Sequence, residues 1–347
     1  MDFDQLVSRQ AARFNADGPH SDVVLLSRVR LARNINGYPF AGQMSDQDHR
    51  SVIQLLSRAA EKLFPGGTTL WIDLQKTSEL DRTCLVERRL IDREFAQETA
   101  PRAILIDNDE LFTIEVNNED HLRVNAFASG LNFPAAWKRV FPIISHLESE
   151  IVFAFDERRG YLTACPSNIG TGLRAAAVLH LPGLIETGEF NRFSQSMQQM
   201  NFTVHSIYGD ARAPGAFFQV CNQITLGPSE GDIIASLETM LPRVLEYEKR
   251  AREHLLKTRG DWLTKQVDTA MNQLKGARQI SFGDALGALS AIRLGFYLDI
   301  QRDVSAKRIN DLIFRVQPAH LQKIADHELA EDEEETFRAN YLHHRLP

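Results

Sequence analysis

Three strand-like segments in the first half of the chain follow one another with only four residues between each pair. Residues 103–106, 111–117 and 122–127 are rich in β-branched and apolar side chains, which is typical of strands. Parallel neighbours need a crossover of about a dozen residues or more, and these connections are too short for one. Neighbouring strands here are therefore antiparallel, which commits this part of the chain to an antiparallel sheet.

The remaining sequence adds strands and flanking helices to this sheet. Further strands are predicted at 68–74, 151–155, 202–207 and 217–226, and helices at 45–63 and in the alanine-rich segment 173–181. The fold class is therefore α+β, with a mainly antiparallel sheet flanked by helices.

From about residue 230 the strand signals stop and amphipathic helical patterns take over. These patterns predict helices at 237–256, 281–297, 305–314 and 318–324, and the acidic run 331–335 is typical of the first turn of a terminal helix. We therefore expect an N-terminal segment over 1–20, an α+β domain over 21–258 and an all-helical C-terminal domain over 261–347.

Charge and cysteine content exclude several classes of protein. The 347 residues carry a net charge of -7, so the average field repels nucleic acid and anionic membranes. No apolar run approaches the roughly 18 to 20 residues that span a membrane, and the first residues lack a secretory signal pattern. Three cysteines without a CxxC pair predict no disulfide framework. We expect a cytoplasmic protein that contacts neither membrane nor nucleic acid directly.

Arginines are concentrated at the end of an apolar run, in the segment Ser27-Arg28-Val29-Arg30. If residues 23–26 begin a strand, period-two alternation places Arg28 and Arg30 on the same face. Two adjacent guanidinium groups repel each other unless an anion lies between them. The pair is therefore either a phosphate clamp or two surface arginines on an edge strand.

The segment 117–123, Asn-Asn-Glu-Asp-His-Leu-Arg, places two acids, a histidine and an arginine in a turn between strands. Loops carry functional residues more often than strand interiors do, and a buried turn with this much charge is costly without a ligand. The turn is therefore either part of a binding site or a group of solvated charges.

A third segment, 165–175, combines a cysteine, two glycines and an arginine. A turn containing Gly170 and Gly172 is predicted to lead into the alanine-rich helix, whose free N–H groups and positive dipole end would suit a phosphate beside Arg174. Cys165 lies just before this turn, and it is either a small buried apolar residue or a thiol activated by nearby cations.

Together these segments resemble the phosphagen (guanidino) kinases. The motifs CPSNIGTGLRA, SRVR and NNEDHLR and the stretch 205–226 occur in the order and spacing of that family. SRVRLARNINGYPF, LHLPGL and NQITLG look like its bacterial protein-arginine kinase branch, and the resemblance covers essentially the whole chain. The resemblance implies the guanidino kinase catalytic fold over 21–258, the helical domain of that branch after residue 261, and ATP-dependent phosphorylation of arginine side chains of proteins.

The resemblance also implies roles for individual residues. Glu119 stands at the position of the catalytic base, Asp210 at that of a second carboxylate, and Cys165 at that of a thiolate that contacts the guanidinium. ATP with Mg²⁺ is the implied cofactor, and no metal site built from protein side chains is expected. The residues at nucleotide-binding positions are Ser27, Arg28, Arg30, Arg89, Arg123, Arg174 and His205.

Some positions depart from the family pattern. Asn118 replaces an acid before the base, His205 stands where an arginine is usual, and Asp210 is shorter than the usual glutamate. These changes leave open a catalytically weak or non-catalytic relative that binds arginine or phosphoarginine segments. A kinase for a small guanidino compound is a further alternative, disfavoured because only some twenty residues precede the SRVR strand, too few for the domain that encloses such substrates.

The resemblance also leads to expectations about a phosphoarginine-binding motif near the C-terminus and about binding partners. The phosphoarginine-binding motif Arg-Asp-x-x-Arg-Ala of the protein-kinase branch corresponds to residues 334–339, which here read Glu-Glu-Thr-Phe-Arg-Ala. Because glutamates repel a phosphoguanidino group, we predict that phosphoarginine does not activate this protein through Arg338. The implied partners are protein substrates such as transcriptional repressors, Clp-type protease machinery, an activator protein and a second copy in a homodimer.

Overall fold

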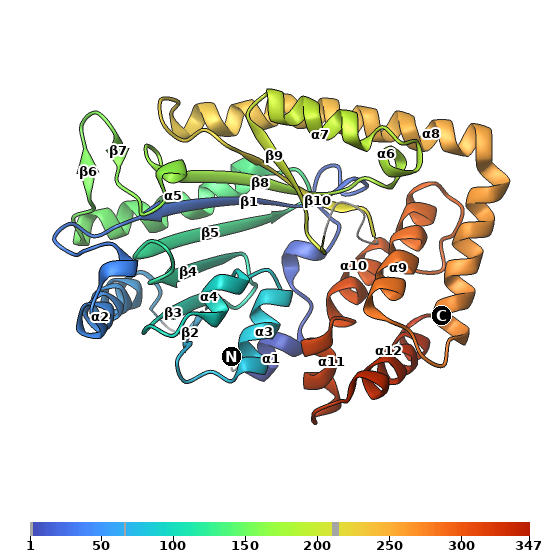
Figure 1. Cartoon of the computed structure of the whole chain (residues 1–347), viewed down its shortest axis with the longest axis horizontal. Helices are drawn as coiled ribbons and strands as arrows, with labels where there is room; N and C mark the ends of the chain where they lie inside the picture. The colour runs from blue at the N-terminus through green and yellow to red at the C-terminus, as the bar shows by residue number, and fades with distance from the viewer. Residues whose placement is uncertain (1–2, 66, 210–214) are drawn as a thin grey trace.

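The computed structural model describes residues 3–65, 67–209 and 215–347, and an eight-stranded sheet lies at its centre (Figure 1). Every neighbouring pair in this sheet is antiparallel, which confirms the predicted fold class. The strand order is β2-β3-β4-β5-β1-β8-β10-β9. These strands are β1 (Val24–Arg33), β2 (Thr69–Asp73), β3 (Ala103–Asp107), β4 (Phe112–Val116), β5 (Leu122–Ser129), β8 (Leu173–His180), β9 (Phe202–Ser206) and β10 (Phe217–Asn222).

One face of the sheet is mostly apolar and is covered by helices; we call it the apolar face. Valine, leucine and alanine side chains from β1, β5, β8 and β10 form one core with the helices there. Ser45 caps the first of these helices through a reciprocal bond with Asp48, at the predicted start of the helix over 45–63. The covering helices are α2 (Asp46–Leu63), α5 (Phe133–Glu150), α6 (Pro182–Glu186), α7 (Phe190–Gln199) and the first part of α8 (Glu230–Gly276).

The opposite face carries arginines at its centre, and we call it the arginine face. Around them, apolar residues of this face pack with the helical C-terminal region into a second core. The helices that contribute to this side are α1 (Phe3–Ser8), α3 (Glu79–Glu87), α4 (Arg93–Gln97), the last part of α8, α9 (Phe282–Tyr297), α10 (Ala306–Arg315), α11 (Pro318–Ala325) and α12 (Glu331–Arg345). Acidic residues fill the first turn of α12, as predicted.

Residues 173–181 were predicted as a helix, and this prediction is wrong. Residues 173–180 form β8, which pairs with β1 on one side and with β10 on the other. Alanine favours helices, but here its small side chain suits a central strand that is covered on both faces. Ala175 and Ala177 lie in the core under the helices, and Ala176 lies opposite Arg28. The helix N-terminus proposed as a phosphate site after Gly172 is therefore replaced by strand backbone.

Two further segments differ from the predictions. Residues 151–155 were predicted as one strand, but Phe153 forms only an isolated antiparallel bridge with Ile35, and Phe155 begins the short hairpin of β6 (Phe155–Asp156) and β7 (Gly160–Tyr161). The helix predicted at 237–256 is part of the much longer α8, which turns at Arg259, a residue with non-helical backbone angles. The kink lies at the predicted domain boundary, and the division into domains stays a prediction.

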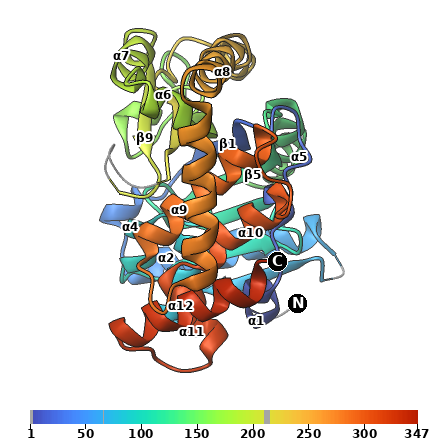
Figure 2. The same cartoon turned by 90° about the vertical axis from the view of Figure 1, so that its right-hand side faces the viewer.

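Helix α8 runs along the sheet and then turns down beside the other C-terminal helices, as Figure 2 shows. Arg293 of α9 is fully buried where these helices meet the sheet, and it donates to the carbonyl oxygens of Ser21 and Asp22 and to Nδ1 of His180. Within the described ranges, no helix is both long and apolar enough to cross a membrane.

Candidate active site

Four arginines from three adjacent strands project from the same face of the sheet. Arg28 and Arg30 lie on β1, and Arg30 pairs in register with Arg174 of β8 on one side and with Asn125 of β5 on the other. Arg123 follows on the same face, two residues before Asn125. Because residues that pair across antiparallel strands share a face, the R-x-R pattern of residues 28–30 becomes part of a two-dimensional group of guanidinium groups.

Arg28 and Arg30 have no hydrogen-bond or ion-pair partner among the residues that the structure describes. The Nε atom of each is buried and unpartnered. Burial, followed by repulsion from Arg123 and Arg28, lowers the pKa of Arg30 to about 10, and Glu115 opposes this only in part. Clustered cations that nearby acids balance only in part are costly, so this arrangement fits a polyanion such as the phosphates of a nucleotide.

Arg123 differs from these two because it already has acidic partners. Its guanidinium bonds to the carboxylate of Glu119 and lies 3.3 Å from Oδ2 of Asp92. The Glu119 side chain keeps 42% of its surface exposed, so a ligand can reach the carboxylate. Asn118 fixes the turn, since its Oδ1 accepts the N–H of Glu119 and its Nδ2 donates to Glu115 at 2.6 Å.

Glu115 and Asp92 were not identified from the sequence, yet both face the arginine group. Glu115 of β4 is buried, pairs in register with Arg123, and accepts from Asn125 at 2.8 Å. Burial is the largest influence on its carboxyl and raises its pKa. Asp92 caps α4 through Oδ1 and turns Oδ2 to Arg123. Strand alternation from Arg123 through the register could have found Glu115, whereas Asp92 comes from a separate turn that leaves no such signal.

Arg174 holds the loop that carries Cys165. Its guanidinium donates to Oδ1 of Asn168, to the carbonyl and hydroxyl oxygens of Ser167 at 3.0 Å each, and to the carbonyl oxygen of Asn222. The sulfur of Cys165 lies 3.0 Å from the Ser167 hydroxyl oxygen and is partly exposed. The loop therefore presents the thiol beside a guanidinium that the protein has fixed in place.

Glycines allow this loop to approach its neighbours closely. Gly170 and Gly172 have positive φ angles of 108° and 64°. A Cβ atom at Gly170 would lie 2.3 Å from the carbonyl oxygen of Thr225, and one at Gly172 would lie 2.5 Å from that of Ala32. The two glycines thus serve close packing of the loop against β1 and the segment after β10.

Asp120, next to Glu119, joins the two loops of the site. It is fully buried, and its Oδ1 accepts from Nδ2 of Asn34 at 2.7 Å and from the N–H of Ala164 at 2.8 Å. Ala164 directly precedes Cys165 in the chain. Asp120 therefore holds the turn of Glu119 and the loop of Cys165 at the same end of β1.

The remaining predicted site residues are placed differently. Arg89 has a left-handed backbone (φ 60°) and bonds to the carbonyl oxygen of Ile207, and repulsion from Arg28 contributes to the lowering of its pKa, after burial. His205 is exposed on β9, opposite Gln219. Asp210 lies outside the described residues.

Ser27 is not brought to the arginine face. Its buried hydroxyl donates to the carbonyl oxygen of Gly130 at 2.8 Å and accepts from the N–H of Asn132 at 3.0 Å, on the apolar side of β1. Alternation explains this, because neighbouring residues of a strand point to opposite faces. Within the described part of the chain, no three histidine, cysteine, aspartate or glutamate side chains are grouped so as to hold a metal ion.

Two family models match this chain. The model of the ATP:guanido phosphotransferase C-terminal catalytic domain matches residues 51–251, and that of the protein-arginine kinase McsB C-terminal domain matches residues 261–347. Curated relatives match along the whole chain. A protein-arginine kinase of Symbiobacterium thermophilum is 39% identical over 100% of this chain and 99% of its own length. Those of Clostridium acetobutylicum and Geobacillus stearothermophilus are 35% and 37% identical over 96% and 97% of this chain, and over 98% and 93% of their own lengths.

Solved structures share the fold. The duplicated taurocyamine kinase from Schistosoma mansoni with bound transition state analog components has a TM-score of 0.62 at 24% identity, over 77% of this chain and 39% of that one. Lombricine kinase has a TM-score of 0.58 at 22% identity, over 72% of this chain and 70% of that one. At these identities the likeness concerns the arrangement of the sheet and its helices.

Proposed function

The chain belongs to the ATP:guanido phosphotransferase family, in its protein-arginine kinase branch, and we propose that it phosphorylates arginine side chains of proteins with Glu119 as the base. The observation that carries the proposal is the pair of unpartnered guanidinium groups of Arg28 and Arg30, close to an accessible carboxylate and a thiol. Positive charge without a counter-ion and a base within one site are what phosphoryl transfer to a nitrogen requires.

The arginine face would bind and orient the phosphates. Arg28 and Arg30 have free donors, Arg123 can exchange its carboxylate partners for phosphate oxygens, and Arg89 lies near Arg28. Arg174 would act by holding the loop at 167–168 and adding positive charge. ATP, when bound, supplies the γ-phosphoryl group, and Mg²⁺ is proposed to enter with the nucleotide and to keep several of its waters.

The acceptor arginine has to lose a proton as its nitrogen attacks. A guanidinium has a pKa above about 12, so a carboxylate must orient it and accept that proton as the new bond forms. Glu119 and Asp92 are both exposed carboxylates of the site, and Glu119, which stands at the family's base position, is proposed for both tasks, with Cys165 beside the guanidinium. Asp210 and His205 keep the proposed roles of second carboxylate and weaker phosphate contact.

Other proposals follow from membership of this branch. Arginine-bearing proteins are the proposed substrates, and Clp-type protease machinery, an activator protein and a second copy of the chain are proposed partners. The cytoplasm is the proposed location. Residues 21–258 are proposed to form the catalytic domain and 261–347 a helical domain, a division supported by the kink of α8 at Arg259.

The experiment that tests the proposed function measures acid-labile phosphate incorporated from Mg-ATP into an unfolded, arginine-rich protein. Free arginine serves as the parallel acceptor and Glu119→Gln as the control. We expect phosphoarginine on the protein acceptor and its loss in the variant. Transfer to free arginine only would point to a small-molecule kinase, and transfer to neither acceptor by a folded, ATP-binding chain would contradict the proposal.

A further inference from the structure

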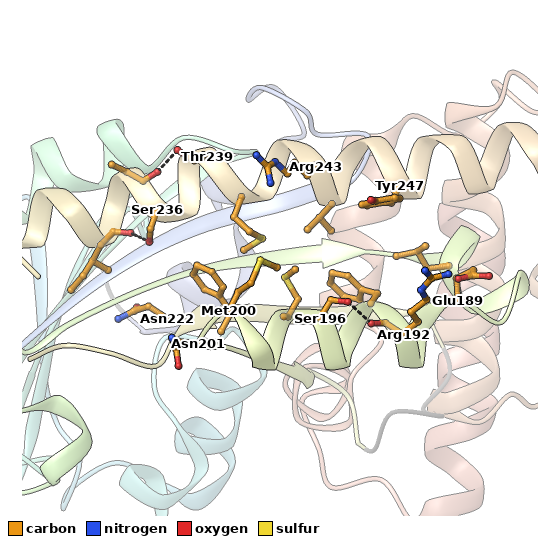
Figure 3. Close-up of a pocket in the computed structure, with 18 of the residues that line it drawn as sticks. Glu189, Arg192, Ser196, Met200, Asn201, Asn222, Ser236, Thr239, Arg243 and Tyr247 are labelled. Atoms are coloured by element: carbon orange, nitrogen blue, oxygen red, sulfur yellow. Dashed lines mark hydrogen bonds between the residues drawn. The ribbon is translucent and has the colours of Figure 1, made fainter.

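A long groove lies between α7 and α8, on the side of the sheet away from the arginine group. Its volume is about 1320 Å³, and Figure 3 shows side chains reaching into it from both helices. Arg243 and Tyr247 extend from α8, and Arg192 and Met200 come from the side of α7. We propose that this groove is a docking site for an acidic amphipathic helix of another protein.

The groove offers apolar surface to water. Its lining includes Phe193, Met197 and Met240 of the core below, and the rim residues Met200 and Tyr247 keep 44% and 63% of their surface exposed. Methionine is flexible and polarizable, so a methionine-lined surface adapts to apolar side chains of different shapes. Exposed apolar residues that line one continuous depression are typical of a binding surface rather than of scattered surface residues.

The charges of the groove select the polarity of its occupant. Arg192 and Arg243 are exposed, lie on opposite walls, and have no ion-pair partner among the described residues. Glu189, which Figure 3 shows beside Arg192, is an exposed acid of the lining, Arg250 pairs with Glu246, and Asp232 caps the start of α8. The lining thus has three arginines and two acids, and in a chain of net charge -7 this local excess of positive charge favours carboxylates on the ligand.

The shape of the groove favours a helix. Both walls are helices, whose backbone groups bond within each helix, so the walls present side chains to a ligand. Such a surface binds an amphipathic helix whose apolar residues recur at positions i, i+3, i+4 and i+7. Wall helix α7 has 10 residues, a length of about 15 Å at 1.5 Å per residue, which three to four turns of a bound helix would cover.

The groove also contacts the segment that supports Arg174. Asn222 and Ile224 line the groove, and the carbonyl oxygens of Asn222 and Gln223 accept from the Arg174 guanidinium. A helix packed on Ile224 would therefore contact the segment whose carbonyl oxygens hold Arg174 of the active site. This coupling rests on the proposed function, whereas docking itself does not.

The test is a binding measurement without nucleotide. A fluorescent, cross-linked helical peptide of about 15 residues carries leucines at i, i+3, i+4 and i+7 and glutamates on both flanks. A matched peptide has lysine in place of each glutamate. Binding to the full chain is followed by fluorescence anisotropy, for the natural protein, for Arg192→Glu/Arg243→Glu, and for the control Lys138→Glu/Lys265→Glu, whose exposed residues lie outside the groove.

We expect saturable binding of the acidic peptide to the natural protein. The groove reversal, Arg192→Glu/Arg243→Glu, should weaken this binding about tenfold, and the control reversal, Lys138→Glu/Lys265→Glu, should leave it unchanged. The lysine peptide is expected to bind more weakly to the natural protein and more tightly to the groove variant. Equal binding of both peptides, or equal weakening by both reversals, would overturn the proposal.

Analytical sedimentation of the natural protein and of the groove variant tests the other possible occupant of the groove, a second copy of the chain. If the chain self-associates and the groove reversal abolishes this, the groove binds a second copy and our assignment is wrong. A failure of peptide binding with intact phosphotransfer rejects the docking site alone, and the opposite result rejects only the proposed activity.

Discussion

Arg123 and Glu119 form an ion pair within one turn, so an arginine proposed to bind phosphate holds the carboxylate proposed as the base. Asp92, 3.3 Å from the same guanidinium, is a second competitor for it. Binding of a phosphate to Arg123 would free Glu119 for the acceptor arginine. Glu119→Gln and Asp92→Asn, compared with each other, separate loss of the base from loss of a negative charge beside Arg123.

Glu119→Gln is expected to reduce phosphotransfer by about 10² to 10⁴, the range for loss of a positioned general base. The same change should strengthen nucleotide binding a few-fold, because Arg123 loses a competing negative charge. Single-turnover kinetics and nucleotide titration measure the two quantities. The matched control Asp92→Asn also removes a charge from Arg123, keeps a residue that can cap α4, and should retain transfer. If both variants lose transfer equally, Glu119 does not act as a base.

Arg30→Met should weaken nucleotide binding and yet stabilise the ligand-free protein. The guanidinium of Arg30 is buried and repelled by Arg123 and Arg28, attraction from Glu115 offsets only part of this, and no hydrogen bond or ion pair holds it within the described residues. An apolar side chain of similar length removes this repulsion, so we expect the free energy of unfolding to rise by about 1 kcal/mol. Chemical denaturation with and without nucleotide measures both effects, with exposed Arg158→Met as the control. A loss of ligand-free stability would contradict this prediction.

Phosphoarginine should not stimulate the kinase through Arg338. This side chain is buried, donates to the carbonyl oxygens of Val316 and Ile280 at 2.8 and 3.0 Å, and pairs with Glu334. Its donors are thus engaged within the helical region. Arg338→Ala should lower the free energy of unfolding by about 3 kcal/mol, because it leaves a carboxylate and two carbonyl oxygens without their donor. A rise in activity with added phosphoarginine, lost in this variant at a temperature where it is folded, would sink the idea.

Mild acid should destabilise the fold through His180. Burial, followed by repulsion from Arg293 and Arg252, holds the pKa of this imidazole well below 6.5. In the unfolded chain His180 therefore binds a proton near pH 6.5, whereas in the folded chain it stays neutral at that pH. The free energy of unfolding consequently falls as pH drops below 6.5. The slope from this group is at most about 1.4 kcal/mol per pH unit.

Denaturation of the natural protein and of His180→Gln between pH 7.5 and about pH 5.5 isolates this contribution. His121 and His320 also have pKa values lowered by burial, and both proteins share their effect. The variant should show a slope shallower by up to one proton. Parallel curves for the two proteins would exclude His180 as a source of the acid sensitivity.

Much of the fold could be predicted because its local signals agree with the final packing. The short connections at residues 107–110 and 118–121 force antiparallel pairing. Ser45 and Ser281 are N-cap residues at the starts of the helices that follow them. Segment 173–180 was wrongly predicted as a helix because alanine favours helices and because a strand that is covered on both faces shows no alternation of polar and apolar residues. Its two neighbouring strands, distant in sequence, decide its structure.

The candidate site divides in the same way. Arg28 and Arg30 could be placed on one face from alternation, which also puts Ser27 on the other face. The pairing of Arg30 with Arg174 depends on the register of strands distant in sequence, so it could not be read from the chain, whereas the short connection at 118–121 could have pointed to Glu115 opposite Arg123. The resemblance supplied positions for Glu119 and Cys165, and their common support by Asp120 required coordinates.

The kinked helix α8 has a further consequence for how the molecule tumbles in solution. One helix belongs to both predicted domains, and Arg293 is buried between the C-terminal helices and the sheet. Neither half can then rotate without the other. Dyes attached to α5 and to α12 should report the same rotational correlation time, that of a single particle of 39.3 kDa or of its oligomer.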